Sequence, residues 1–380
     1  QQSNTSKLAA TAGDQQMAWD TFGNLWLTQF GAGLSSIVAL SSDGGASFSL
    51  LFDSGGGTDQ PSIAAGAGIV VMDWNQAGQM HTVGAKVTGL GQVGAFSSKQ
   101  TAPGNGTFGD IAIGPNGQYM LVYQENDGGE GPVGKFAAVD PDGLGPLGFG
   151  PLINLGISNV GAFDTIPAQP DRTIDAELNL AWDRSGGPNN GRVYLSYVEE
   201  LVDESSDTDV FVQYSDDNGA NWSAKIRVND DTLGNGKSQF MPAIALDQTN
   251  GDVAMTWYDC RNSAGNNKVQ VFASISRDGG LTWDAPILVA NSGGATYFND
   301  KVWVGADPNN DNVVISWTRF KDNPQYGYVE SPIVAATSSN FGASWSSYVN
   351  VSGPYRYNQG SVPVYGPNGA IYISLGGKEA

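Results

Sequence analysis

Basic and aromatic side chains recur in the polar segments that separate the apolar runs of this sequence. An arginine can bind a carboxylate through two parallel hydrogen bonds, and an aromatic ring can stack on the apolar face of a ligand ring. The basic members are Arg172, Lys237, Arg261, Lys301, Arg319, Lys321 and Arg356. The aromatic members are Tyr297, Tyr326, Tyr328, Tyr355 and Tyr357. Together, these basic and aromatic residues indicate a pocket for a ligand that carries a carboxylate. The alternative is that the cations only neutralise acidic neighbours such as Glu199, Asp259 and Asp300.

His81 is the only histidine in the chain. Its imidazole can take up a proton near neutral pH, so it is a candidate general base. The alternative is a structural or solvated histidine.

Composition predicts an all-β fold and narrows the range of partners. The chain has 380 residues with 52 glycines and ten tryptophans, and its apolar runs are short, as in many short strands joined by tight turns. A net charge of −20 argues against a nucleic-acid partner, and no run is long enough for a membrane helix. The single cysteine, Cys260, excludes an intramolecular disulfide. We expect one domain over residues 1–380, secreted and monomeric, with four N-glycosylation sequons, at Asn4, Asn105, Asn221 and Asn350.

A turn of the form Ser-x-Asp-x-Gly-x-Ser/Thr-aromatic recurs along the chain. Its aspartate can accept backbone N–H groups, its glycine allows positive φ, and its aromatic ring can pack between neighbouring sheets. We expect these aspartates to be structural. The copies cover residues 41–48, 215–222, 276–283 and 338–345, the last with Asn340 in place of aspartate.

A second repeat is a hairpin of two apolar strands around a Gly/Asn/Asp turn. Six of the hairpins precede a further pair of strands, which predicts a β-propeller of four-stranded antiparallel blades. Seven blades are favoured over six, with segment 7–12 adding a strand to the last. The hairpins cover residues 17–30, 62–74, 109–123, 178–197, 243–257, 302–317 and 362–375. The long interval between Tyr123 and Leu178 is predicted to be an inserted loop.

The four Ser-x-Asp-x-Gly turns resemble the Asp boxes (BNR repeats) of sialidase-like β-propellers. With the strands of each blade named A to D from the axis outward, these boxes would be C–D turns. The B–C and D–A loops would then share the opposite face, which would carry the function. Sialidases of this superfamily use an early arginine, whereas the first 171 residues contain none. Sialidase activity is therefore not expected.

In architecture, length and residue types the chain also resembles secreted propeller polysaccharide lyases, such as fungal rhamnose-glucuronate lyases. That resemblance implies β-elimination next to a uronic acid in an acidic poly- or oligosaccharide. Such a reaction needs a base, an acid for the leaving oxygen and cations that neutralise the carboxylate. The expected catalytic residues are His81, Tyr355, Tyr357, Arg172, Arg261, Arg319 and Arg356. The expected substrate-binding residues are Lys237, Tyr297, Asn299, Asp300, Lys301, Tyr326 and Gln359.

Two alternatives stay open. The first is an exo-acting glycoside hydrolase, similar to the arabinanases built on sialidase-like propellers, with two carboxylates as acid and nucleophile. Its candidates are Asp59, Glu125, Glu199, Asp259 and Asp300. The second is a sugar-binding propeller without catalysis. No cofactor and no catalytic metal are expected, and a structural Ca²⁺ in the axial channel is considered.

Overall fold

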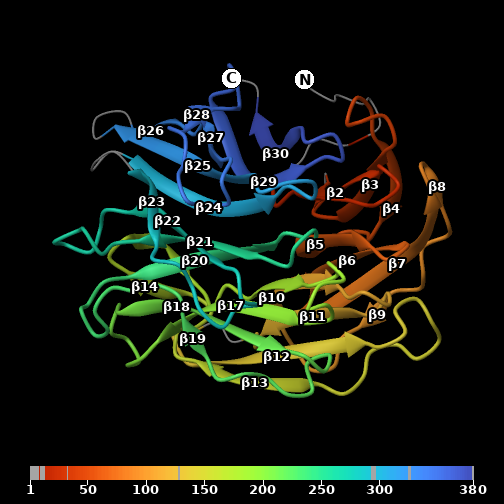
Figure 1. The fold of residues 1–380 in the computed structure, drawn as a ribbon, viewed down its shortest axis with the longest axis horizontal. Helices are drawn as coiled ribbons and strands as arrows, with labels where there is room; N and C mark the ends of the chain where they lie inside the picture. The colour runs from red at the N-terminus through yellow and green to blue at the C-terminus, as the bar shows by residue number, and fades with distance from the viewer. Residues whose placement is uncertain are drawn as a thin grey trace.

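The computed structural model describes residues 8, 13–31, 33–126, 129–291, 297–323 and 327–378. Asn4, Tyr326 and all but Leu8 of segment 7–12 lie outside these residues. The described chain is built from β-strands without an α-helix (Figure 1). Accordingly, these residues contain no helix long and apolar enough to span a bilayer.

Six antiparallel sheets of at least four strands and two two-stranded hairpins follow one another along the described chain. The first sheet contains β1 (Gln16–Trp19), β2 (Leu25–Phe30), β3 (Ser36–Ser41) and β4 (Ser49–Asp53). The second contains β5 (Thr58–Gly66), β6 (Ile69–Gln76), β7 (Gln79–Gly89), β8 (Gln92–Val93) and β9 (Gln100–Thr101). The third contains β10 (Thr107–Ile113), β11 (Tyr119–Gln124), β12 (Val133–Asp140) and β13 (Ile153–Ser158).

The later sheets repeat this order after a short inserted hairpin of β14 (Asp164–Ile166) and β15 (Gln169–Ile174). The fourth sheet contains β16 (Asn179–Trp182), β17 (Val193–Glu200), β18 (Thr208–Ser215) and β19 (Ile226–Arg227). The fifth contains β20 (Gln239–Leu246), β21 (Val253–Asp259), β22 (Gln270–Ser276) and β23 (Ile287–Asn291). The sixth contains β24 (Tyr297–Ala306), β25 (Val313–Asn323), β26 (Gly327–Glu330), β27 (Ile333–Ser338) and β28 (Val349–Asn350). The last pair is β29 (Tyr357–Tyr365) and β30 (Ile371–Lys378).

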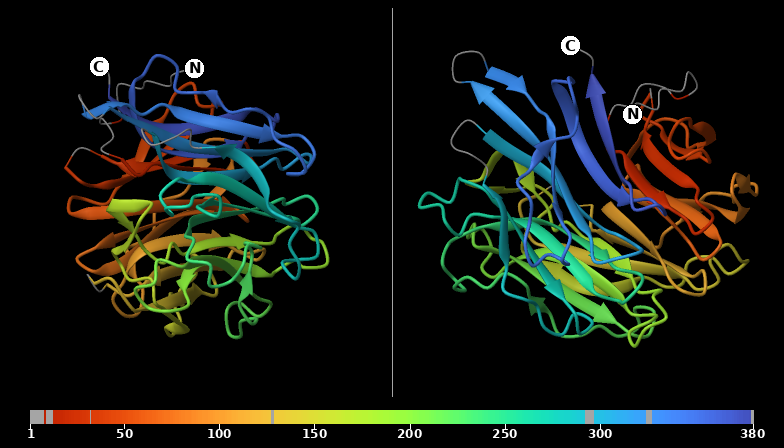
Figure 2. Two further views of the ribbon diagram at one scale, coloured as in Figure 1. Left: turned by 90° about the vertical axis from the view of Figure 1, so that its left-hand side faces the viewer. Right: turned by 45° about the horizontal axis from the view of Figure 1, so that its top comes forward.

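The sheets follow one another around a central axis, as in a β-propeller (Figures 1 and 2). Each first strand contacts the first strand of the next sheet, and β29 contacts β1 and so closes the ring. The predicted hairpins are confirmed, since β1 pairs with β2 and the other six pair in the same way. The last sheet has two described strands, so the preference for seven complete blades stays a prediction.

The hydrophobic core lies between neighbouring sheets. Trp26 of the first sheet packs with Trp74 of the second, and Trp257 of the fifth sheet packs with Tyr194 of the fourth. Leu25 packs near Tyr372 of the last hairpin, which continues the core across the junction of first and last sheets. Because a sheet buries apolar side chains on both faces, each one depends on its two neighbours for burial.

The Asp-box turns have the predicted hydrogen bonds. In the turn after β22, Asp278 accepts the backbone N–H of Thr282 at 2.9 Å, and Gly280 has φ of 85°. Trp283 of the same turn packs against the core between the fourth and fifth sheets. The hydrogen bonds in the first box, chiefly from Ser47 and Ser41, lower the pKa of Asp43 to about 2.

The Asp boxes lie on the face that carries the turns between the first and second strands of each sheet. Arg192, before β17, donates to the carbonyl oxygen of Gly279 in the next sheet's Asp box at 2.7 Å. Gln118, before β11, donates to Asn218 at 3.1 Å in the same manner. The first strands therefore begin at the opposite face, where binding residues were expected.

Asp278→Ala is expected to lower the free energy of unfolding by about 1–3 kcal/mol, because backbone N–H groups of the turn lose their acceptor. Chemical denaturation measures this change. Asp311→Ala, at an exposed carboxylate in the turn between β24 and β25, serves as a control for the loss of a surface charge. An unchanged stability in Asp278→Ala would contradict the structural role.

Candidate functional site

The start of each innermost strand carries the same backbone irregularity. One residue there has positive φ, between 45° and 68°, and in five of the strands the register with the second strand shifts at this point. A bulge of this kind redirects a side chain, and strained backbone of this kind clusters at functional sites. The residues are Asp14, Gln60, Phe108, Glu177, Met241, Lys301 and Gly360.

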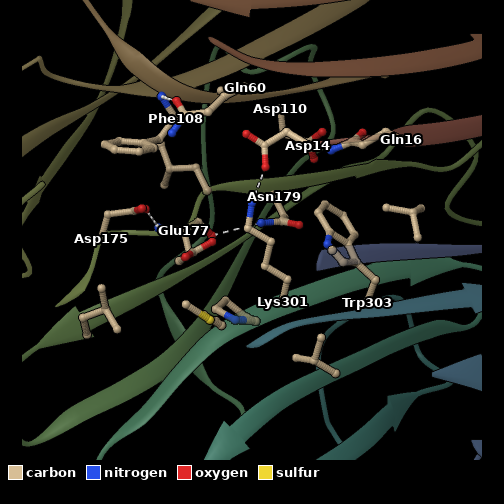
Figure 3. Close-up of a pocket in the computed structure, with 18 of the residues that line it drawn as sticks. Asp14, Gln16, Gln60, Phe108, Asp110, Asp175, Glu177, Asn179, Lys301 and Trp303 are labelled. Carbon is tan, nitrogen blue, oxygen red and sulfur yellow. Dashed lines mark hydrogen bonds and ion pairs between the residues drawn. The ribbon is translucent and has the colours of Figure 1, made fainter. Parts of the chain in front are cut away.

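All seven of these residues line one cavity on the propeller axis, with a volume of about 270 Å³. Residues two positions further along the strands, among them Gln16, Asp110, Asn179 and Trp303, also line it (Figure 3). The inserted segment before β16 adds Phe163 and Arg172 to the wall. The Phe163 ring meets the Phe108 ring edge to face, with centroids 5.8 Å apart. The bulges thus bring amide, carboxyl and aromatic side chains from separate sheets into one central site.

Asp110, on β10, is a carboxyl group held in the cavity wall. Its Oδ2 accepts the backbone N–H of Leu180 on β16 at 2.8 Å, which ties two neighbouring sheets together. Burial raises the pKa of Asp110 to about 6, and this hydrogen bond opposes the rise. At neutral pH Asp110 is therefore mostly ionised, while a modest fall in pH protonates it.

Asp175 and Glu177 form a second acidic group, at the approach to β16. Asp175 accepts the backbone N–H of Glu177 at 2.6 Å, and the carbonyl oxygen of Glu177 accepts from Asn179 at 3.2 Å. Burial and then the nearby charge of Asp175 raise the pKa of Glu177 well above its usual range. Burial therefore favours the protonated form of Glu177, and the carboxyl groups of Glu177 and Asp110 line the same cavity.

Both cations of the cavity are already paired with carboxylates. Lys301 donates to Asp14 at 2.5 Å, and Arg172 lies 3.4 Å from Oδ2 of the buried Asp300. Although burial disfavours its ammonium form, the carboxylates of Asp14 and Asp300 raise the pKa of Lys301. Among the described residues of the cavity wall, no Lys or Arg is left to neutralise an anionic ligand without breaking one of these pairs.

Arg172 and Lys301 are thus the expected site residues that line the cavity, and Asp300 lies directly behind them. Asn299 is fully buried beside Asp300, and Gln359 is exposed with its carbonyl oxygen bound by Gln15. The functional roles of these residues stay predictions.

The remaining expected residues that the structure describes do not line the cavity, and most have local partners. His81 lies on β7, is 4% exposed, and hydrogen-bonds Thr101 at 3.0 Å. Burial lowers the pKa of His81 and so favours its neutral form.

Ion pairs and ring contacts engage several of the expected cations and aromatic residues. Arg261 pairs with Asp259 and Asp230, and Arg319 lies 3.7 Å from the centroid of the Tyr297 ring. The Lys237 ammonium donates to the carbonyl oxygens of Ser263 and Ala264, the Lys321 side chain pairs with Glu330, and the Tyr357 ring packs on the Tyr328 ring. The backbone carbonyl oxygens of Tyr355 and Arg356 accept hydrogen bonds from the Asn358 side chain and the Ser331 backbone N–H. Arg319 and Lys321 thus both lie beside the Tyr297 ring, whereas Arg261 and Lys237 have their partners elsewhere. None of these residues lines the cavity.

The other carboxylates considered for hydrolysis also lie outside the cavity wall. Glu199 pairs with the buried Lys135 at 3.3 Å, and Asp259 with Arg261. Glu125 accepts a backbone N–H from Gly134, and Asp59 precedes the bulge at Gln60.

Sequence reasoning missed Asp14, Asp110, Asp175 and Glu177 because it sought the site in loops. If the first residues of the seven innermost strands had been aligned with one another, these acidic residues would have fallen at or near equivalent positions, all beside the propeller axis.

Among the described residues, no group of three or more His, Cys, Asp or Glu side chains has an arrangement suited to a metal ion. A structural Ca²⁺ in the axial channel stays a prediction.

Comparisons with known proteins agree with this fold. The BNR/Asp-box repeat family matches residues 213–224, one of the predicted turns. A search of curated proteins found no sequence match.

The BP39L lectin from Burkholderia pseudomallei is similar in structure, with a TM-score of 0.56, 11% identity, and coverage of 97% of this chain and 96% of the lectin. The GH93 α-L-arabinofuranosidase of Fusarium graminearum, in complex with arabinobiose, has a TM-score of 0.51 and 10% identity. The match covers 99% of this chain and 97% of the arabinofuranosidase. A protein of unknown function from Dyadobacter fermentans has a TM-score of 0.50 and 12% identity, and the match covers 97% of this chain and 96% of that protein. The chain is an all-β propeller that carries Asp-box repeats.

Proposed function

We propose that the protein is a glycoside hydrolase that cleaves a sugar in the axial cavity, with Glu177 as general acid and Asp110 as base or nucleophile. The observation that carries the proposal is that two carboxyl groups, Asp110 and Glu177, line one cavity from adjoining sheets. Burial favours the protonated form of Glu177, which suits a general acid. Glycoside hydrolysis requires such a pair, one to protonate the leaving oxygen and one to act at the anomeric carbon.

The cavity supports hydrolysis better than the β-elimination that we first expected. A lyase must neutralise the substrate carboxylate and place a base near the C5 proton. Here Arg172 and Lys301 already neutralise Asp300 and Asp14, and His81 lies on β7 outside the cavity wall. A neutral sugar fits these charges better than a uronate does.

The size of the cavity favours action on the end of a glycan. Its volume of about 270 Å³ lies near the lower limit of small-molecule sites, which is roughly 300 Å³. Trp303 and Phe108 offer ring faces for a sugar, while Gln60 and Asn179 offer amides for its hydroxyl groups. Because one structurally similar propeller is an arabinofuranosidase that binds arabinobiose, arabinose-containing oligosaccharides are the first substrates to test.

The test is incubation of the protein with arabinobiose, debranched arabinan and a panel of neutral and uronate-containing polysaccharides. We expect new reducing ends without an unsaturated product. An unsaturated uronate with its ultraviolet absorbance would instead establish the lyase. Saturable sugar binding without any cleavage would establish the sugar-binding propeller.

The pH dependence of hydrolysis should follow the two carboxyl groups. Activity is expected to fall as the pH drops through about 6, because Asp110 becomes protonated and can no longer act as a base. It should also fall at high pH, where Glu177 loses the proton it must donate. Initial rates across the pH range measure both limbs. A profile that stays flat down to pH 4 would contradict the role of Asp110.

We also propose that the enzyme is secreted and acts as a monomer. Asn105, Asn221 and Asn350 occupy exposed positions in N-glycosylation sequons, which supports an extracellular location. Sedimentation velocity at micromolar concentration tests the monomer directly.

A further inference from the structure

Four aromatic rings form a continuous row outside the axial cavity, on the face opposite the Asp boxes. The residues are Phe298 on β24, Phe320 on β25, Tyr328 on β26 and Tyr357 on β29 (Figure 1). Successive ring centroids in this order are 5.9, 5.8 and 5.4 Å apart. None of the four side chains is fully buried, and Tyr328 is 46% exposed. The row therefore crosses the sixth sheet outward from its innermost strand and offers ring surface to solvent.

The row begins next to the axial cavity. Lys301 follows Phe298 by three residues, and Gly360 follows Tyr357 by three residues. Lys301 and Gly360 are the bulge residues of their strands and line the cavity. Because a strand advances about 3.3 Å per residue, the inner end of the row lies roughly 10 Å from the cavity lining. An oligosaccharide that extends out of the cavity on this side meets the rings.

The exposed Tyr328 ring is held in one orientation. The buried Ser331 hydroxyl donates to the carbonyl oxygen of Asn358 at 2.6 Å and accepts the backbone N–H of Asn358 at 2.9 Å. The Tyr328 hydroxyl forms a short hydrogen bond with the same Ser331 oxygen, and it must be the donor because the Ser331 proton is already used. A ring that is fixed beforehand loses little side-chain entropy when a ligand stacks on it. The row is thus preorganised for binding.

The charges around the row favour a neutral sugar. Strand alternation places Arg319 and Lys321 on the other face of β25, where both lie beside the Tyr297 ring. The exposed Asp322 shares the face of Phe320, and it lies opposite Tyr328 in the register of β25 and β26. A sugar can stack on the rings and donate hydroxyl protons to this carboxylate. An apolar protein surface would leave the carboxylate buried without a partner, and a uronate would be repelled by it.

We propose that Phe298, Phe320, Tyr328 and Tyr357 form a row of accessory subsites that binds the outer units of a neutral glycan whose end lies in the axial cavity. That the glycan end occupies the cavity rests on the proposed function, whereas glycan binding by the row does not.

The test is native gel electrophoresis of the full chain in gels that contain a soluble polysaccharide. Debranched arabinan, arabinogalactan, xylan and mixed-linkage β-glucan are the neutral probes, and polygalacturonate is the anionic one. Glu177→Gln is the background for every sample, so that cleavage does not shorten the probe. At least one neutral polysaccharide is expected to slow migration, while polygalacturonate should not. Migration unchanged by all the neutral probes, or slowed only by polygalacturonate, would overturn the proposal.

Tyr328→Ala assigns the binding to the row. It should weaken the affinity for the bound polysaccharide roughly 3–10-fold, the usual effect of losing one aromatic stacking contact. Phe320→Ala should act in the same direction, and Tyr328→Phe, which keeps the ring, should retain most of the affinity. Phe22→Ala is the matched control, because Phe22 is 40% exposed in the turn after β1, on the Asp-box face. Equal affinity in Tyr328→Ala and Phe22→Ala would overturn the proposal.

A second copy of the chain is the rival occupant of the row. Sedimentation velocity of the unaltered protein and of Tyr328→Ala distinguishes it from a glycan. We expect the same sedimentation coefficient for both proteins. A dimer that dissociates in Tyr328→Ala would assign the rings to a contact between copies and overturn the proposal.

The outcome is separable from that of the hydrolysis test. If no glycan is cleaved while Tyr328→Ala loses polysaccharide affinity, the proposed function fails and the subsites stand. If glycans are cleaved, Tyr328→Ala should lower kcat/KM for the polysaccharide relative to its disaccharide roughly 3–10-fold, because a disaccharide is too short to span the row. If that ratio and the gel mobility both stay the same, the subsites fail and the proposed function stands.

Discussion

Glu177→Gln is expected to reduce the rate of glycoside hydrolysis by roughly 10²–10⁴-fold, the usual contribution of a positioned general acid. The amide keeps the size of the side chain but cannot give a proton to the leaving oxygen. The loss should be smaller for an aryl glycoside with an activated leaving group, which departs without protonation. Initial rates on the natural linkage and on such an aryl glycoside measure both effects.

Glu125→Gln is the matched control for this substitution. Glu125 lies in the loop after β11, outside the cavity wall, and accepts the N–H of Gly134 at 3.1 Å. Its replacement should leave hydrolysis within about twofold of the unaltered enzyme. Full activity of Glu177→Gln on the natural linkage would remove Glu177 from the mechanism.

Asp110→Asn should lower hydrolysis by a similar factor, roughly 10²–10⁴-fold, because the variant loses the negative charge and the base at the anomeric carbon. The side-chain oxygen of asparagine can still accept the N–H of Leu180, so the contact between β10 and β16 should persist. Unlike the Glu177 variant, this one should remain slow on activated aryl glycosides. Added azide or formate should restore part of its activity by replacing the missing carboxylate.

Asp53→Asn provides the control for this second substitution. Asp53 ends β4, is exposed, and accepts the N–H of Gly55 at 3.0 Å. Hydrolysis should be unaffected in that variant. If Asp110→Asn kept the activity of the unaltered enzyme, another carboxyl group of the cavity would have to supply the base.

The fold could be predicted from the sequence because its signals are local and repeated. A box such as residues 276–283 encodes its own turn: Asp278 accepts the backbone N–H groups that follow it, and Gly280 takes the positive φ. Each hairpin carries its apolar alternation and its turn within about 20 residues. These features depend little on the rest of the chain, and both were confirmed.

The site could be predicted only in part, because it is assembled from residues far apart in the sequence. Of the residues predicted from the B–C and D–A loops, Arg172 and Lys301 line the axial cavity. The carboxyl groups of Asp110 and Glu177 lie instead at the bulged starts of the innermost strands, where an apolar strand pattern conceals them. Their raised pKa values arise from burial by neighbouring sheets, which the residues next to them in sequence do not reveal.

His81 and Arg261 illustrate the opposite case. Both are residue types that often carry chemistry, and both occur near polar loops. In the folded chain His81 packs beside Trp74, with ring centroids 5.7 Å apart, and Arg261 is held by Asp259 at 2.8 Å. Residue type alone does not distinguish a reactive group from one that already has its partners.

The most direct test of the axial site is a crystal structure of the Glu177→Gln variant soaked with an oligosaccharide that the unaltered enzyme cleaves. We predict a sugar ring in the cavity against Trp303 and Phe108, with its glycosidic oxygen about 2.6–3.2 Å from the substituted side chain. The Asp110 carboxylate should face the anomeric carbon of the same ring. An oligosaccharide bound instead beside His81 or in the loops around Arg261 and Tyr357, with the cavity empty, would contradict the assignment.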